Sequence, residues 1–478
     1  MSICCWSDDA AYGDGNARTL GESMAERVLV PFTGEGSGVD ELSWGQEHIW
    51  QAMRASGSSL AMSAIRPLAP GATVEQFADE LGFYMRRFQT MRTRLRFRPD
   101  GRTLQVLESA GEVELEIVDA DPDADPAKLA EAVSARHYDT PFDYERDWPV
   151  RMTLVRQGGS LTHMVMTLSH HAADATAAMV MFTDMLARDP VTGAAAGPVA
   201  AVQPLELARL QREPTARRQS DAALRYWEET LRAIPARRFA EPDHPPFEDR
   251  HRHWRPAFTS TAMFLALRRV AAQTRADATS ALLALYSVAL ARVTGRNPVV
   301  SQLLVNNRFR PGFDKIVGPL IQAGLCVVDV AGLTFDEAVQ HARRRSMTAY
   351  KHSYYDRLRL NDLIERVGRE RGEEIDLGCI FNDRRLQLPQ VVEGPLPTEA
   401  EIQAALPLTT ISWDTRLDQF NERLMMNFNN GDGTVAVEVT VDTHYLPPPL
   451  LEAYLRELES VTIEAGRDLH APTGVPAP

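Results

Sequence analysis

Two adjacent histidines and an aspartate lie close together in the segment Ser169-His170-His171-Ala172-Ala173-Asp174-Ala175. A free imidazole has a pKa of about 6.5, so at neutral pH it can accept a proton and return it. Acyl transfer to an amine or a hydroxyl needs such a group, because the attacking atom must lose its proton. Asp174 comes four positions after His170 and can hold the loop in shape, directly or through a cationic partner. The segment is therefore a candidate acid–base site.

The flanking sequence predicts the elements that position these side chains. Residues 161–168 are rich in β-branched and apolar residues, which predicts a largely buried strand. Residues 175–187 place apolar side chains at helical spacing, which predicts a helix, and Asp174 is a suitable N-cap for it. The histidines thus follow the end of a strand and lie in a short loop that ends at a helix N-terminus. Such a loop can present a reactive side chain on a rigid scaffold.

Other interpretations of the segment stay open at the level of the residues. A loop of this kind can be a structural cap whose histidine is hydrogen-bonded and does no chemistry. The pattern His-His-x-x-Asp could bind a metal, but no other cluster of His, Cys or Asp supplies the remaining ligands, so no metal site is expected. A serine hydrolase would need a Gly-x-Ser-x-Gly turn, and nucleotide chemistry a Walker loop or a Gly-x-Gly-x-x-Gly segment; the sequence contains none of these.

Composition argues against several classes of function. The chain of 478 residues has a formal net charge of −14 and a pI near 5.4, unlike a nucleic-acid binder held by phosphate contacts. Hydrophobic residues at 44% are typical of a soluble globular protein, and no stretch approaches the roughly 18–20 apolar residues of a membrane span. The four cysteines have no metal-ligand spacing and the N-terminus shows no secretory signal. We therefore expect a cytoplasmic protein with reduced thiols.

The length predicts more than one domain, and a stretch rich in Pro, Gly and Ala marks the candidate boundary. We expect a flexible N-terminus over 1–38, an N-terminal lobe over 39–190, a linker over 191–205, a C-terminal lobe over 206–467 and a flexible tail over 468–478. Each lobe shows several strand signals with flanking helices. Further predicted helices are 74–92, 127–138, 222–234, 265–294 and 450–465, and further predicted strands are 95–107 (a hairpin), 113–118, 149–155, 299–305, 325–330, 375–382, 409–413, 424–429 and 434–442.

The histidine segment resembles the signature of the condensation domains of nonribosomal peptide synthetases. That signature is His-His-x-x-x-Asp-Gly, and its second histidine is catalytic. Aligned on Asp174, the second histidine is His170, while Ser169 replaces the first histidine, Ala175 replaces the glycine and His171 falls on a variable position. The resemblance therefore selects His170, and not His171, as the catalytic residue.

Other motifs of that family have counterparts over about residues 40–465. Each motif alone is loose, but together they are specific. The similar segments are 42–50, which retains Gln46 and Trp50; 87–95, which keeps Arg87, Arg92 and Thr93; 141–143 with 149–151; and 317–325, which preserves Gly318 but has Gln322 in place of Asn and is followed by Val327 in place of Arg.

The resemblance implies a mixed α/β fold of α+β two-layer lobes. Two subdomains like chloramphenicol acetyltransferase would form a V, with the active site in a central tunnel. It implies that Arg308 pairs with Asp174, and that these two residues, with Ser169, His171 and Ala175, support the active site. It also indicates candidate substrate-binding residues, namely Gly318, Gln322, Asn382 and Trp413.

By the same resemblance, we expect a free-standing condensation enzyme of natural-product biosynthesis. It would transfer a carrier-tethered acyl or aminoacyl thioester to a small amine or alcohol, forming an amide or an ester. No intrinsic cofactor is implied, because the phosphopantetheine arm of an acyl- or peptidyl-carrier protein, met in trans, carries the substrate. Neither nucleic acid nor a membrane is an expected partner. The run Arg343-Arg344-Arg345 could contact an acidic carrier or could be a solvated helix face.

Two alternatives remain at this level. One is an acyltransferase that uses coenzyme A thioesters, or an epimerase, of the same superfamily. The other is a non-catalytic domain that docks another enzyme on a carrier. The intact spacing between His170 and Asp174 argues against the second alternative, whereas the changes at Ser169 and Ala175 leave room for it.

Overall fold

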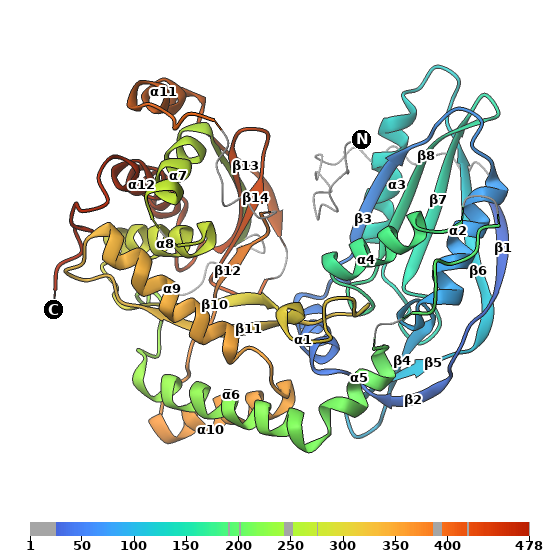
Figure 1. Ribbon diagram of the computed structural model, residues 1–478, viewed down its shortest axis with the longest axis horizontal. Coiled ribbons are helices and arrows are strands. Elements are labelled where there is room, and N and C mark those ends of the chain that lie inside the picture. The colour runs from blue at the N-terminus through green and yellow to red at the C-terminus, as the bar shows by residue number, and fades with distance from the viewer. Residues whose placement is uncertain are drawn as a thin grey trace. The chain divides into compact units, whose positions relative to one another are not determined.

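The chain folds into two compact units that are not continuous in sequence (Figure 1). The computed structural model describes residues 25–189, 192–199, 202–242, 252–274, 276–385, 394–417 and 420–477. The first unit contains the described residues up to Arg217 together with Asn306–Ile321, and the second contains Arg218–Val305 and the described residues from Gln322 onward. This division differs from the boundary expected at 191–205, because the chain returns to the first unit after residue 305.

A five-stranded sheet in the order β1-β6-β7-β8-β3 forms the centre of the first unit. Neighbouring strands pair antiparallel except β6 and β7, which are parallel. Side chains alternate along β7, so that Leu154 and Val155 enter core clusters on opposite faces of the sheet. The strands are β1 Glu26–Thr33, β3 Met62–Pro67, β6 Ala110–Asp119, β7 Val150–Gln157 and β8 Ser160–Leu168; a smaller sheet contains β2 Gly38–Glu41, β4 Thr93–Phe97 and β5 Thr103–Leu107.

Helices cover both faces of this sheet. Buried side chains of α2 and α4 join the core cluster on one face, and those of α3 join the cluster on the other. Polar side chains begin these helices, because each accepts a hydrogen bond from an unpaired amide of the first turn. The helices of the first unit are α1 Trp44–Ser56, α2 Val74–Arg87, α3 Pro126–Asp139, α4 Ala175–Leu186 and α5 Pro204–Gln211, with N-caps Ser43, Thr73, Asp125 and Asp174 on the first four.

The second unit is built on a seven-stranded sheet in the order β11-β10-β12-β14-β15-β9-β13. The three strands β10, β12 and β14 are parallel to one another, whereas β15, β9 and β13 extend the sheet in antiparallel fashion. The strands are β9 His253–Ser260, β10 Val299–Asn306, β11 Ile321–Val328, β12 Cys379–Asp383, β13 Thr410–Leu417, β14 Leu424–Asn430 and β15 Val435–Asp442.

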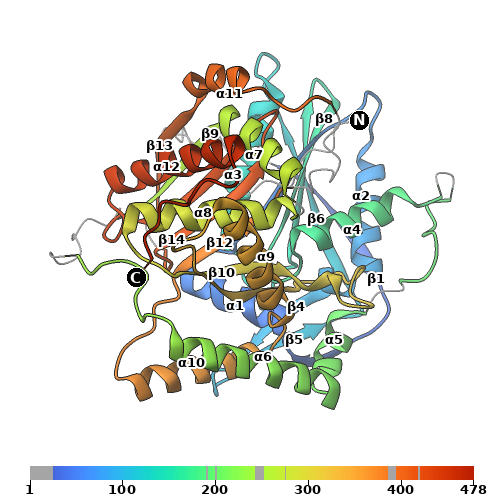
Figure 2. The ribbon, with the colours of Figure 1, turned by 60° about the vertical axis from the view of Figure 1, so that its left-hand side comes forward.

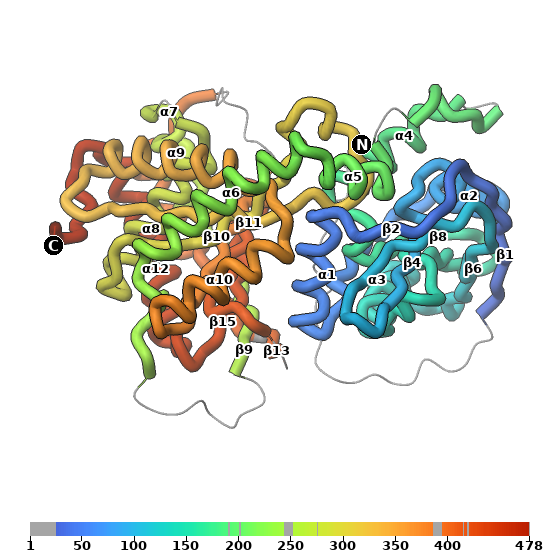
Figure 3. Tube along the Cα trace, turned by 90° about the horizontal axis from the view of Figure 1, so that it is seen from below, coloured from blue at the N-terminus to red at the C-terminus, as the bar shows by residue number. Residues whose placement is uncertain are grey.

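Helices also cover both faces of the second sheet. One core cluster combines apolar residues of α7, α8, α9 and α12 with the sheet, and Figure 2 shows α7, α8 and α12 together over it. A second cluster joins α6 and α10, which lie side by side in Figure 3, to β10 and β11. The helices are α6 Pro214–Ala233, α7 Thr261–Gln273, α8 Ala278–Thr294, α9 Phe335–Lys351, α10 Arg357–Arg371, α11 Glu399–Ala405 and α12 Pro448–Arg467. The expected mixed α/β fold is confirmed.

The apolar stretch 265–294 is two helices and not one continuous block. α7 and α8 meet at an angle of 118°, and Asp277 begins α8 by accepting a hydrogen bond from the amide of Ser280 at 2.9 Å. In the part of the chain that the structure describes, no single helix has the length and apolarity to cross a membrane, and this bent pair meets the criterion by length and composition only.

The described residues 25–38 and 468–477 are more ordered than the sequence suggests. The expected flexible N-terminus includes all of β1, which pairs with β6 along its whole length; residues 1–24 lie outside the described residues. The expected flexible tail packs on the second unit, because the Thr473 hydroxyl donates to the Val330 carbonyl at 2.9 Å and the Val475 carbonyl accepts from Gly332 at 2.9 Å. Backbone pairing holds the first segment, and backbone and side-chain hydrogen bonds hold the second; the composition of the two segments does not reveal these bonds.

Candidate active site in the first unit

The turn between β8 and α4 presents His170. β8 ends at Leu168, α4 begins at Ala175, and the side chain of His170 is half-buried between buried neighbours. Its Nδ1 lies 2.8 Å from the carbonyl oxygen of Ala173, and its backbone amide donates to the carbonyl of Ser59 at 3.4 Å. The ring is thus tied to its own turn on one side.

This contact determines which ring nitrogen of His170 can accept a proton. A carbonyl oxygen only accepts, so Nδ1 of the neutral ring carries the hydrogen and donates it. The lone pair is then on Nε2, which is the arrangement of an imidazole that is ready to act as a base. The side chain has the correct tautomer for proton abstraction without contacting a carboxylate.

His171 has a different environment. It is 3% exposed, and its Nδ1 lies 2.8 Å from the hydroxyl of Ser169, which is fully buried. Burial lowers the pKa of His171 to about 4, so its ring is neutral at neutral pH. The structure therefore gives His171 a packed position, whereas His170 is the histidine that is partly open to solvent.

Asp174 is fully buried and every one of its contacts comes from a donor. Its Oδ2 accepts from Arg308 Nη1 at 2.7 Å and from the amide of Leu320 at 3.0 Å, and its Oδ1 accepts from the amide of Ala177 at 2.8 Å as the N-cap of α4. The ion pair expected between Asp174 and Arg308 is present. A carboxylate whose oxygens accept hydrogen bonds from three such donors fixes the loop and is not placed to exchange a proton.

Arg308 joins the loop to the segment that enters the first unit after β10. Besides Asp174, its guanidinium donates to the carbonyls of Ile316 at 3.0 Å and Gly318 at 2.8 Å, and to the side-chain oxygen of Asn306 at 2.9 Å. Gly318, which was expected to bind substrate, thus provides a carbonyl oxygen that holds the arginine in place. Ala175 is exposed at the first position of α4.

Two motif segments earlier in the chain contact the histidine turn and the segment Asn306–Ile321. The hydroxyl of Thr90 donates to the carbonyl of Ala172. Gly45 in α1 lies against the carbonyl oxygen of Pro319, where an added Cβ would come within 2.1 Å of it. Only glycine permits this approach. The sequence indicated both motifs, but not that Thr90 supports the histidine turn.

The remaining candidates belong to the second unit. Gln322 is fully buried and its amide nitrogen donates to the Tyr355 carbonyl at 2.8 Å while its oxygen accepts from the Tyr355 amide at 3.4 Å. Each polar atom of its side chain thus has a backbone partner in Tyr355, and its role towards a substrate stays a prediction. Asn382 donates to the side chain of Asn427 at 2.8 Å, and Trp413 packs edge-to-face on Trp254 at 5.9 Å.

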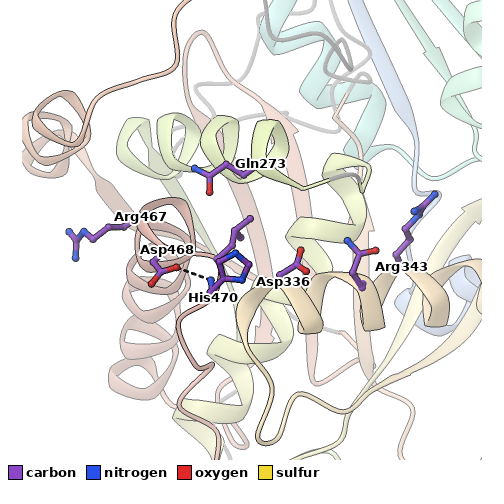
Figure 4. Close-up of a pocket in the computed structure, with 8 residues that line it drawn as sticks. Gln273, Asp336, Arg343, Arg467, Asp468 and His470 are labelled. Carbon is purple, nitrogen blue, oxygen red and sulfur yellow. Dashed lines mark hydrogen bonds between the residues drawn. The ribbon is translucent and has the colours of Figure 1, made fainter.

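A cavity of about 670 Å³ lies in the second unit, at the end of α12 and the start of α9 (Figure 4). Its lining is mostly polar, with Asp336, Arg343, Arg467 and His470 among the residues, and it contains no side chain that the sequence selected for chemistry. Among the residues that the structure describes, no group of His, Cys, Asp and Glu has the geometry to hold a metal ion.

Comparison with protein families and curated proteins gives one consistent finding. A family model described as the condensation domain matches residues 38–382. The isonitrile lipopeptide synthase of Mycobacterium tuberculosis is 28% identical over 269 residues, which are 53% of this chain and 10% of that synthase. The curated relatives are much longer proteins, and the chain spans between 2% and 11% of their lengths.

Solved structures agree on the fold. The condensation domain of the monacolin K polyketide synthase is similar with a TM-score of 0.68 and 16% identity, covering 92% of this chain and 100% of that one. The X-domain from teicoplanin biosynthesis is similar with a TM-score of 0.68 and 18% identity, covering 92% of this chain and 97% of that one. At such identities the likeness concerns the fold alone.

Proposed function

This chain belongs to the condensation-domain family, and on that premise we propose that it catalyses an amide- or ester-forming condensation with His170 as the base. The donor is an acyl or aminoacyl thioester on the phosphopantetheine arm of a carrier protein, and the acceptor is a small amine or alcohol. The observation that carries the proposal is the half-buried imidazole of His170, whose Nδ1 is occupied by the carbonyl of Ala173 at 2.8 Å.

The chemistry follows from that tautomer. The acceptor nitrogen or oxygen attacks the thioester carbonyl carbon, and Nε2 of His170 takes the proton that the acceptor loses. The tetrahedral intermediate collapses, the carbon–sulfur bond breaks, and the proton passes to the departing thiolate. The products are the amide or ester and the free thiol of the carrier. Asp174 and Arg308 hold the turn in place and exchange no proton.

The test is turnover by the full chain with a loaded carrier supplied in trans. Amines and alcohols would be offered as acceptors, and product formation would be detected by intact-protein mass spectrometry of the carrier. His170→Ala is expected to reduce turnover about 10²–10⁴-fold, the usual contribution of a general base. His163→Ala is the matched control, because His163 lies on β8 and is also half-buried, and it should leave turnover unchanged. Full turnover by His170→Ala would overturn the mechanism.

The same assay separates the alternatives. Equal turnover with the acyl group on coenzyme A would favour the coenzyme A acyltransferase, and a stereochemical change without acyl transfer would favour the epimerase. The replacement of the first motif histidine by Ser169 and of the glycine by Ala175 supports one further candidate, a domain that recruits an enzyme to a carrier without catalysis. Carrier binding with no product from any acceptor would favour that candidate.

A further inference from the structure

Two buried side chains flank His170 and are bonded to each other. The Ser169 hydroxyl and His171 Nδ1 are 2.8 Å apart, and the two residues are 0% and 3% exposed. Residues 169 and 171 are both buried, whereas His170 between them is half-buried. The position of His170 therefore depends on how firmly this Ser169–His171 pair is held.

Hydrogen bonds hold the His171 ring in part. Its Nδ1 lies 2.8 Å from the Ser169 hydroxyl, and the backbone of Thr93 also acts on the ring as a hydrogen-bond partner. The ring is uncharged at neutral pH, so no ion pair orients it. Packing against the two faces and edges of the ring completes its orientation.

Tyr144 supplies that packing. Its ring lies edge-to-face on His171, with centroids 5.5 Å apart and planes at 89°. Tyr144 in turn lies edge-to-face on Trp50 at 5.1 Å, and Trp50 stacks on Phe97 at 5.4 Å. We call Phe97, Trp50, Tyr144 and His171 the aromatic ladder. Aromatic pairs prefer edge-to-face and offset-stacked arrangements, so the ladder favours one ring orientation at each step.

The segment that carries Tyr144 is fixed independently of the histidine turn. The Tyr144 carbonyl accepts from the amide of Leu95 at 2.8 Å. Arg151 donates to the carbonyls of Thr140 at 2.6 Å and Pro141 at 2.9 Å, and its guanidinium lies 3.7 Å from the centroid of the Phe142 ring. The tyrosine is therefore a fixed surface against which the turn packs.

We propose that Tyr144 is a positioning residue for His170. Its ring orients the His171 imidazole, the imidazole holds Ser169, and the pair sets the direction in which His170 leaves the turn. The proposal rests on the proposed role of His170 as the base. In this role Tyr144 contacts neither substrate, so its replacement should change kcat and not substrate binding.

The decisive comparison uses three variants of the full chain in the carrier assay. Tyr144→Phe keeps the ring but loses the hydroxyl, which is hydrogen-bonded to the Ser169 side chain, so kcat should fall, but less than in Tyr144→Leu. Tyr144→Leu keeps apolar volume but removes the ring, and kcat should fall about tenfold while KM for both substrates changes less than twofold. The matched control is Tyr226→Leu, because Tyr226 stacks on His352 at 4.7 Å in the second unit. It also removes a contact between a tyrosine ring and a histidine ring, there stacked at 16° and not edge-to-face, and it should leave kcat unchanged.

A spectroscopic readout distinguishes positioning from loss of stability. In ¹⁵N NMR of histidine-labelled protein, the resonances missing from His170→Ala identify His170, and its neutral form should be the tautomer protonated at Nδ1. Tyr144→Leu should reduce the fraction of that tautomer, whereas Tyr226→Leu should not. If Tyr144→Leu does not fold, His171→Phe retains a ring against Tyr144 but loses the bond to Ser169, and it should show the same two changes.

Two outcomes must be kept apart. Unchanged kcat and tautomer in Tyr144→Leu, together with an inactive His170→Ala, would overturn the positioning role alone; for His171→Phe the same result would do so. Full activity of His170→Ala would instead overturn the proposed function on which it rests.

Discussion

Each unit contains a strand that leads into a helix through a short turn with a buried carboxylate, and the two turns differ in what surrounds that carboxylate. In the first unit, Asp174 lies between β8 and α4; in the second, Asp442 ends β15 just before α12. Both side chains are 0% exposed. The pair offers a comparison of similar residues with different consequences.

The partners of the two carboxylates explain the difference. Asp174 is satisfied by Arg308 and backbone amides, and no histidine contacts it among the described residues. Asp442 contacts two arginines, at 3.3 Å from Arg252 and 3.4 Å from Arg423, and also lies 3.8 Å from His253.

The histidines near the two carboxylates also differ in their exposure. Both histidines near Asp442, His253 and His444, are 6% exposed, whereas His170 is half-buried. The imidazole of His253 lies against its carboxylate beside two arginines and is part of the interior. In the first turn, Arg308 and backbone amides hold the carboxylate, and the ring of His170 lies against a carbonyl oxygen instead. The first turn therefore leaves one imidazole partly open to solvent, whereas the second encloses both of its histidines.

The largest effect on stability should come from removing the arginine of the first turn. Arg308→Ala leaves Asp174 buried without a cation, which should lower the free energy of unfolding by about 3–5 kcal/mol. Arg252→Ala leaves Asp442 with Arg423 and His253, so the loss should be about 1 kcal/mol. Urea unfolding of both variants measures the difference. Equal losses would show that the two carboxylates are held alike.

Acid should affect the two turns differently. The pKa of His171 in the folded chain is about 4 against 6.5 when free, so the unfolded chain binds more protons between these values. Its contribution to stability is complete above pH 6.5 and is lost as the pH falls towards 4. Lowering the pH from 7 to 5 should therefore cost about 2 kcal/mol through this residue.

His171→Phe tests this assignment, since it removes the titrating group but keeps a ring. Urea midpoints at pH 7 and pH 5 should converge in the variant relative to the unmodified chain. At His253, burial also lowers the pKa, but Asp442 acts in the opposite direction, so His253→Phe should change the pH dependence less. If His171→Phe kept the original dependence of stability on pH, His171 would not be the source of that dependence.

The sequence predicts the local part of the first turn well. The N-cap role of Asp174 follows from the switch between strand and helix periodicity, and the family motif led to the pair with Arg308. Contacts from distant segments were not predictable in this way. Thr90 and Tyr144 reach the turn because the sheet and helices bring residues that are far apart in sequence together, and no periodicity encodes that.

Partners that are distant in sequence explain the remaining differences. Gln322 occupies a motif position that suggests a substrate contact, yet its amide is satisfied by the backbone of Tyr355. β1 follows a segment rich in Gly and Ser and contains Pro31, features that suggest a loop, but as the edge strand of its sheet it needs pairing on one side only. Both cases concern polar or irregular residues whose partners are distant in sequence.

The smallest expected effect concerns Ala175, where the family motif has glycine. Ala175 is exposed at the first position of α4, so Ala175→Gly should cost about 0.5 kcal/mol or less and change turnover less than twofold. Ala178→Gly is the matched control, because Ala178 is 1% exposed inside the same helix and its loss should cost about 1–2 kcal/mol. Thermal unfolding and the carrier assay measure both variants. If Ala175→Gly instead raised turnover tenfold, the alanine would be limiting catalysis, and the departure from the motif would weigh towards the recruiting role.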